Sequence, residues 1–116
     1  MPTKRQKTFL FVCEANQRRS RAAEDLCAGL VRNRNLPIKV CSAGMSQQAD
    51  TPITRAMADQ ADLIFVMEDH MKQDLQRTYG QPAAKIVCLD IPDEYERDSL
   101  VLLRLLRDGI SPYLAQ

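Results

Sequence analysis

The chain has 116 residues, of which 45% are hydrophobic and 27% are charged, so it can build one folded core and does not have the composition of a disordered tail. Sixteen Lys and Arg residues against fifteen Asp and Glu leave a formal net charge of +1, which gives no overall positive field for nucleic acid. No apolar run is long enough to cross a bilayer or to serve as the apolar part of a signal peptide.

The four cysteines are widely separated and form no Cys-x-x-Cys pair, which argues against a disulfide scaffold and against a zinc site; they are Cys13, Cys27, Cys41 and Cys88. We therefore expect a cytoplasmic protein that needs no metal and no other cofactor. We also expect a monomer or weak dimer, with no nucleic-acid partner and no membrane partner.

The first half of the chain predicts two strands and two helices. Residues 1–7 are expected to be a flexible polar lead-in, and residues 8–116 a single domain. Residues 8–12 form a short apolar run typical of a buried strand, and residues 20–32 have helical spacing with Ser20 as the cap. Residues 38–41 predict a second strand, and Thr51 followed by Pro52 predicts the start of a second helix.

The second half continues the same alternation. Residues 63–67 and 86–89 predict buried strands, and between them a helix is expected from a cap at Asp69 to about Gly80. A leucine-rich helix is expected from residue 98 or 99 to residue 107, with its end at Gly109. The pattern predicts an α/β fold in which helices cover both faces of a four-stranded parallel sheet, whose ligand crevice lies beyond the carboxyl ends of the strands.

The loop after the first strand carries the pattern Cys-x5-Arg-Ser, from Cys13 to Ser20. A tight loop between a strand and a helix can turn backbone N–H groups inward, and the helix dipole adds positive potential there. A thiol at Cys13 would then favour the thiolate form, Arg19 would grip phosphoryl oxygens, and Ser20 would donate to the sulfur. The remaining candidates for substrate binding lie in the same loop: Glu14, Ala15, Asn16, Gln17 and Arg18.

A nucleophile beneath a phosphate cradle predicts phosphoryl transfer through a cysteinyl-phosphate intermediate. The leaving oxygen needs a proton, and the loop after the fourth strand offers two carboxylic acids, Asp90 and Asp93. Spacing does not choose between them. Tyr95 in the same loop is a candidate to flank the substrate or to pack on the last helix.

Four segments resemble low-molecular-weight protein tyrosine phosphatases in order and register. They are residues 9–20 with the Ala-Glu that follows, Ser42-Ala43-Gly44, residues 61–68, and residues 91–95. The resemblance implies strand order 2-1-3-4, with Asp93 as the general acid. It also implies hydrolysis of phosphotyrosine in a phosphorylated protein, or of a small phosphomonoester.

The chain departs from this family's pattern at two places. Arg18 stands where many members have a second cysteine that can protect the nucleophile as a disulfide, and Glu94 stands where proline usually follows the acid. The run from Asn16 to Ser20 also resembles a cysteine phosphatase that acts on serine in the RNA polymerase tail. Arsenate reduction on the same fold would need a relay pair of cysteines, which Cys88 lacks. A phosphate-binding module without useful catalysis is the competing class, because a Glu14 carboxylate facing inward would oppose a bound dianion.

Overall fold

The computed structural model describes residues 6–114, and they form a four-stranded parallel sheet in the order β2-β1-β3-β4. The strands are β1 (Lys7–Cys13), β2 (Ile38–Gly44), β3 (Leu63–Val66) and β4 (Ile86–Cys88). The helices are α1 (Arg19–Arg34), α2 (Arg55–Gln60), α3 (Asp69–Thr78) and α4 (Leu100–Leu114), with a short 3-10 turn at Ala83–Lys85. The expected fold class and strand order are confirmed.

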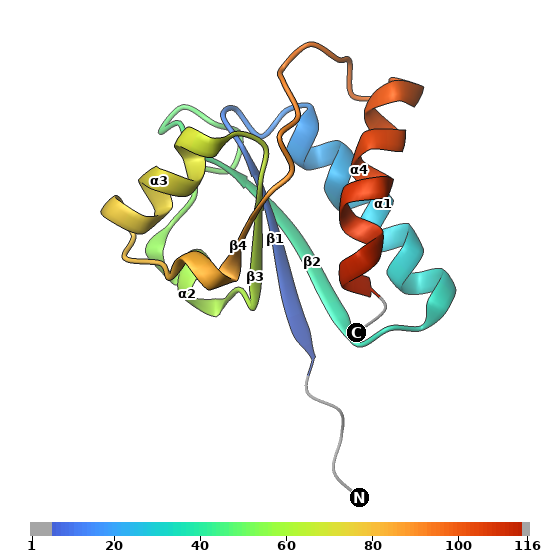
Figure 1. The fold of residues 1–116 in the computed structure, drawn as a ribbon, viewed down its shortest axis with the longest axis horizontal. Coiled ribbons are helices and arrows are strands. Elements are labelled where there is room, and N and C mark those ends of the chain that lie inside the picture. Colours follow the sequence, from blue (N-terminus) through green and yellow to red (C-terminus); the bar gives the residue numbers. More distant parts are fainter. Residues whose placement is uncertain (1–5, 115–116) are drawn as a thin grey trace, which may run out of the picture.

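Helices cover the sheet on both sides. In Figure 1, α1 and α4 lie together against one face, and α2 and α3 lie against the other. Aromatic rings fill the first interface: Phe65 stacks on Phe11 with ring centroids 4.8 Å apart and meets Tyr113 of α4 edge-on at 5.3 Å. Because alternate residues of a strand face opposite sides, Leu10 and Val12 point to the second interface. Both faces of β1 are therefore buried, which explains its continuous apolar run.

Two predicted helix starts were wrong, and the cap predicted at Asp69 lies one residue earlier, at Glu68. The second helix begins at Arg55, where the Thr54 side chain accepts a hydrogen bond from the Met57 backbone N–H. Residues 51–53 instead run alongside Gly44, which pairs with Pro52 in an isolated parallel bridge. Ser20 does not cap α1: it is a buried residue of the first turn, and Arg18 holds the cap position without a side-chain hydrogen bond. Both differences come from contacts that local capping preference does not encode. Pro52 pairs with Gly44, and the Ser20 hydroxyl bonds to Asn16 and Cys13 instead of capping the helix.

The last helix is longer than predicted, because it continues through Gly109 to Leu114. Its buried residues recur every four positions, from Leu102 through Leu106 and Ile110 to Leu114, and this spacing keeps one face on the core. Gly109 marks a close approach rather than a helix end: a Cβ atom there would lie 2.7 Å from Cδ2 of Leu89. Ser99 caps this helix by accepting from the Leu102 N–H at 3.3 Å.

Only the last two residues of the predicted lead-in belong to the described part of the chain. Residues 1–5 of the expected lead-in 1–7 lie outside the described residues, whereas Lys7 already belongs to β1 and pairs with Ile38 of β2. Across residues 6–114, no helix combines the length and the apolar character that a membrane span needs.

Candidate active site

The loop between β1 and α1 is fastened by its carbonyl groups to a neighbouring segment. The carbonyls of Cys13, Glu14 and Ala15 accept hydrogen bonds of 2.9 to 3.1 Å from the N–H groups of Met45, Ser46 and Asp50, respectively. Within the described part of the chain, the N–H groups from residue 15 to residue 18 donate to no backbone carbonyl. The carbonyls are thus turned outward and satisfied, while the amides remain available, which is the arrangement of an anion-binding nest.

Gly44 makes this close packing possible. A Cβ atom at Gly44 would lie 2.5 Å from the Cβ of Ala49 and 2.7 Å from the carbonyl oxygen of Glu14. Either distance is shorter than real Cβ contacts allow, so any side chain here would push the loop away from its partner segment.

A short hydrogen-bond chain fixes the polarity of the cysteine environment. The Asn16 Nδ2 group donates to Ser20 Oγ at 2.8 Å, and Ser20 Oγ lies 3.0 Å from Cys13 Sγ. Because Ser20 Oγ accepts from Asn16, its own hydrogen is free to point to the sulfur. All three residues are buried, and Asn16 adopts the left-handed conformation, with φ of 56°, that asparagine tolerates. The loop therefore places a hydroxyl group that can donate a hydrogen bond beside Cys13 Sγ.

Arg19 is buried and held from the far side of the sheet edge. Its Nη1 atom donates to the carbonyl oxygen of Ile91 at 2.7 Å and to Glu68 Oε2 at 3.1 Å. Its Nε atom lies 3.8 Å from Asp93 Oδ1. Within residues 6–114, Nη2 makes no hydrogen bond, so one edge of the guanidinium group is anchored and the other is available to a ligand.

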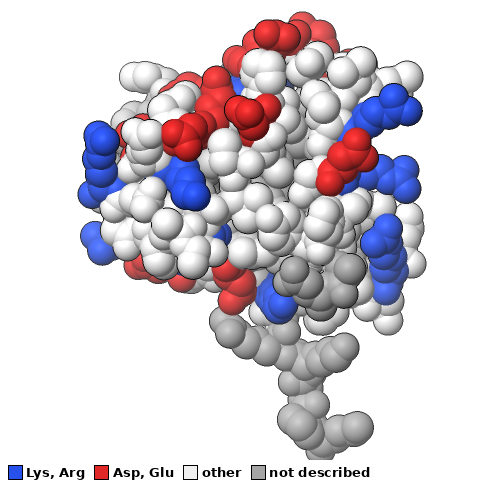
Figure 2. Space-filling view, in the orientation of Figure 1, with Lys and Arg blue, Asp and Glu red and all other residues white. Residues whose placement is uncertain are grey.

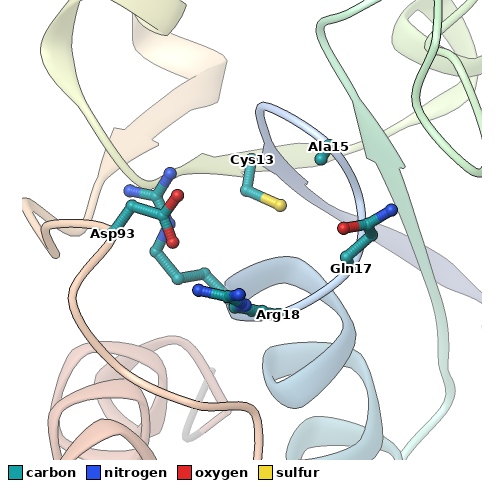
Figure 3. A pocket seen from close by; sticks show the side chains of 6 residues that line it. Cys13, Ala15, Gln17, Arg18 and Asp93 are labelled. Carbon is teal, nitrogen blue, oxygen red and sulfur yellow. The ribbon is translucent and has the colours of Figure 1, made fainter.

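These groups surround one small cavity of about 180 Å³ at the carboxyl end of the sheet; Cys13, Ala15, Gln17, Arg18, Arg19 and Asp93 line it. Figure 3 shows the Cys13 sulfur pointing into the middle of the cavity, with Asp93 on one side and Gln17 on the other. The structure therefore brings a thiol, two guanidinium groups and a carboxyl group to one cavity.

Comparison with known proteins identifies a family that the first half of the chain resembles. The family model described as low molecular weight phosphotyrosine protein phosphatase matches residues 8–60, which include the whole loop and β2. The solved structures that share the fold include tyrosine phosphatases of this type. Residues 8–60, a little under half of the chain, therefore resemble the low-molecular-weight phosphotyrosine protein phosphatase family in sequence. No curated protein sequence matches the chain.

Three solved structures illustrate how this family fold is shared. YfkJ from Bacillus subtilis is 21% identical with a TM-score of 0.83, covering 98% of this chain and 96% of its own. The tyrosine phosphatase Wzb from Escherichia coli K30, in complex with phosphate, is 24% identical with a TM-score of 0.75, covering 95% and 97%. The arginine phosphatase YwlE, in a variant with a phosphorylated active-site serine, is 21% identical with a TM-score of 0.67, covering 92% and 90%. At these identities the likeness shows the fold alone.

The structure separates the residues that the sequence proposed for the phosphatase site. Asn16 and Ser20 lie beneath the cavity as supports of Cys13, and Tyr95 packs partly buried against the core. The carboxylate of Glu14 is directed to α3, where Oε1 lies 3.8 Å from His70 Nε2, and Glu14 is not among the residues that line the cavity. Of the two candidate acids, Asp93 lines the cavity and Asp90 does not.

Sequence reasoning missed Glu68, which forms an ion pair with Arg19. Its position two residues after the end of β3 was a usable signal, because the carboxyl ends of parallel strands meet at one edge. The contact of Arg19 with the Ile91 carbonyl had no such signal, since any residue type supplies a backbone oxygen.

The other three cysteines of the chain lie outside the cavity. Burial raises the pKa of the Cys27 thiol from 9.0 to about 11, and Cys27 is fully buried in α1. Burial also raises the pKa values of Cys41 and Cys88. These three thiols therefore stay protonated at neutral pH and behave as small apolar side chains.

Proposed function

We propose that the protein is a cysteine-dependent phosphatase that hydrolyses phosphotyrosine in proteins through a cysteinyl-phosphate intermediate. The observation that carries this proposal is the placement of Cys13 Sγ at the base of the cavity, with the Ser20 hydroxyl 3.0 Å away and with Arg19 and Asp93 in the cavity wall. A nucleophile, a phosphoryl cradle and an acid are the three parts that the reaction requires.

In the first step, Cys13 Sγ attacks phosphorus and the bond from phosphorus to the ester oxygen breaks. Asp93, protonated at this stage, gives its proton to the leaving oxygen, so that the alcohol or phenol departs neutral. In the second step, water attacks the phosphocysteine, Asp93 takes a proton from that water, and the bond from phosphorus to sulfur breaks. Inorganic phosphate leaves and Cys13 returns to the thiolate.

Charge on the phosphoryl oxygens is stabilised by donors that are in place beforehand. The free edge of Arg19 binds two of the three phosphoryl oxygens, and the unpaired backbone N–H groups of residues 15–18 bind the third. Because Glu68 and the Ile91 carbonyl already fix the guanidinium group, little reorganisation accompanies the reaction. Ser20 supports the sulfur as nucleophile and then as leaving group.

The noncatalytic alternative depended on a Glu14 carboxylate inside the phosphate site. That carboxylate points to His70 instead, so the reason for preferring a binding module is absent. Fold likeness extends to a tyrosine phosphatase and to an arginine phosphatase, so the substrate panel must cover phosphotyrosine, phosphoserine and phosphoarginine peptides.

The decisive experiment is hydrolysis of para-nitrophenyl phosphate in the presence of EDTA. We expect turnover by the wild-type protein, loss of turnover in Cys13→Ser, and full turnover in the matched control Cys88→Ser. Rapid acid quenching with a ³²P-labelled substrate should trap a phosphoenzyme whose label maps to Cys13. Turnover retained in Cys13→Ser would refute the proposal.

A further inference from the structure

The first turn of α1 has an unusual excess of positive charge. Arg18, Arg19 and Arg21 lie at or next to its N-terminus, and the first turn contains no acidic residue. The helix dipole is already positive at this end, so it disfavours each of these cations. Such an arrangement is stable when an anion binds there, and it carries more positive charge than the Arg19 clamp alone needs.

Arg18 differs from Arg19 in its partners. Arg19 is compensated by Glu68 and Asp93, whereas the side chain of Arg18 forms no ion pair or hydrogen bond within the described part of the chain. Arg18 is exposed and lines the same cavity as Cys13. In Figure 3 its side chain lies along the rim between Asp93 and Gln17. An uncompensated guanidinium group thus stands at the edge of the reaction site.

The surroundings limit what this cation can attract. Figure 2 shows acidic side chains gathered along the upper edge of the molecule, over the loop that leads into α4. That loop exposes Asp93, Glu94, Glu96 and Asp98. The acidic edge opposes anions that remain at a distance, but salt screens it over about 8 Å, whereas a contact ion pair at Arg18 is screened much less. Arg18 can therefore select an anion that sits directly on its fork.

We propose that Arg18 binds a second anionic group of the substrate, and that the preferred substrates are phosphomonoesters with a carboxylate or another anion close to the phosphoryl group. This inference rests on the proposed function, because it uses the same cavity. The phosphoryl group occupies the Arg19 cradle, and the second anion meets Arg18 at the rim. The second anion can be the side chain of an acidic residue beside phosphotyrosine in a protein, or a carboxylate of a small phosphomonoester, called here a small diacid.

The test compares two aryl phosphates of equal size, 2-(carboxymethyl)phenyl phosphate and 2-(carbamoylmethyl)phenyl phosphate, in which the second group lies next to the phosphoryl group. We expect kcat/KM for the carboxylate ester to exceed that for the amide by about tenfold at low salt, with the difference in KM rather than kcat. Arg18→Gln should bring the ratio to about one, and the matched control Arg32→Gln, at the other end of α1, should leave it unchanged. A wild-type ratio of one or below, or an unchanged ratio in Arg18→Gln, would overturn the proposal.

A binding measurement separates this proposal from the catalytic one. Calorimetric titration of the Cys13→Ser variant with the same two esters should show the same preference, even if the wild-type protein turns over neither. Equal binding of the two esters, or the same preference after Arg18→Gln in that background, contradicts the role of Arg18 whatever the catalytic result. Phosphotyrosine peptides with glutamate or glutamine next to phosphotyrosine then identify the source: a preference for glutamate there supports a protein substrate, and preference in the small esters alone supports a small diacid.

Discussion

The sulfur of Cys13 and the hydroxyl oxygen of Ser20 lie 3.0 Å apart, although seven positions separate them in the chain. Asn16 donates to that hydroxyl, which leaves the hydroxyl hydrogen free to point to the sulfur. The loop thus uses two neutral side chains to support the sulfur of a third. This relationship leads directly to a measurable property of the nucleophile.

We expect Ser20→Ala to make Cys13 a poorer nucleophile, because the hydrogen bond to the charged sulfur is lost. Such a bond is worth enough to lower kcat by about tenfold. Alkylation of Cys13 by iodoacetamide at one fixed pH should be slower in Ser20→Ala than in the wild type. Ser111→Ala, a serine substitution in α4, serves as the control. Identical alkylation rates for Ser20→Ala and wild type would contradict this assignment.

The choice of acid is tested by two isosteric substitutions. Asp93→Asn should lower kcat for an aryl phosphate by about 10²-fold or more, because the leaving oxygen then receives no proton. Asp90→Asn should have little effect, since Asp90 lies outside the cavity and asparagine tolerates its positive φ of 58°. Steady-state kinetics across pH 5 to 8 make the comparison. A larger loss from Asp90→Asn would show that the wrong aspartate was chosen.

Gly44→Ala should disrupt the loop, because the added Cβ would lie too close to both the Ala49 side chain and the Glu14 carbonyl oxygen. A shift away from one of them does not remove the clash with the other. We expect a loss of about 1 to 3 kcal/mol in the free energy of unfolding and a marked fall in kcat. Urea denaturation and phosphatase assays measure the two effects.

Gly29→Ala is the matched control for that substitution. Gly29 lies within α1, and a Cβ there would meet nothing within 4 Å. It should stabilise the protein by about 0.5 to 1 kcal/mol, because alanine loses less conformational freedom than glycine in a helix. Equal effects of the two substitutions would show that close packing at Gly44 does not matter.

Stability should fall at high pH because of Cys27. Between pH 9 and 11 the unfolded chain releases the Cys27 proton while the folded chain keeps it, so rising pH favours unfolding. A rise from 9.0 to about 11 corresponds to about 3 kcal/mol. The destabilisation caused by Cys27→Ala, measured with urea at pH 8 and again at pH 11, should therefore shrink by about 2 kcal/mol, because the folded thiol is itself half ionised at pH 11. An equal destabilisation at both values of pH would mean that the folded protein ionises this thiol as readily as the unfolded chain.

Much of the fold was predictable because it depends on short-range patterns. Buried strands produce apolar runs such as that of β1, and the position of Cys13 between a strand and a helix marked the loop before any geometry was known. Helix boundaries were predicted less well, because Gly109 and Pro52 serve contacts with distant segments that local preference does not encode. Arg19 was predicted to bind phosphate, but the partners that hold its guanidinium group were not predicted. They lie 49 and 72 positions away in the sequence.

The three backbone bonds that tie the carbonyls of residues 13–15 to residues 45–50 have a practical consequence for protein engineering. The eight residues from Cys13 to Ser20 are not expected to form this loop on their own. Transferred to another strand-to-helix junction, they would lose the three hydrogen bonds that fix the orientation of the loop backbone. A graft intended to bring this chemistry to a new scaffold must carry the segment around Gly44 with it.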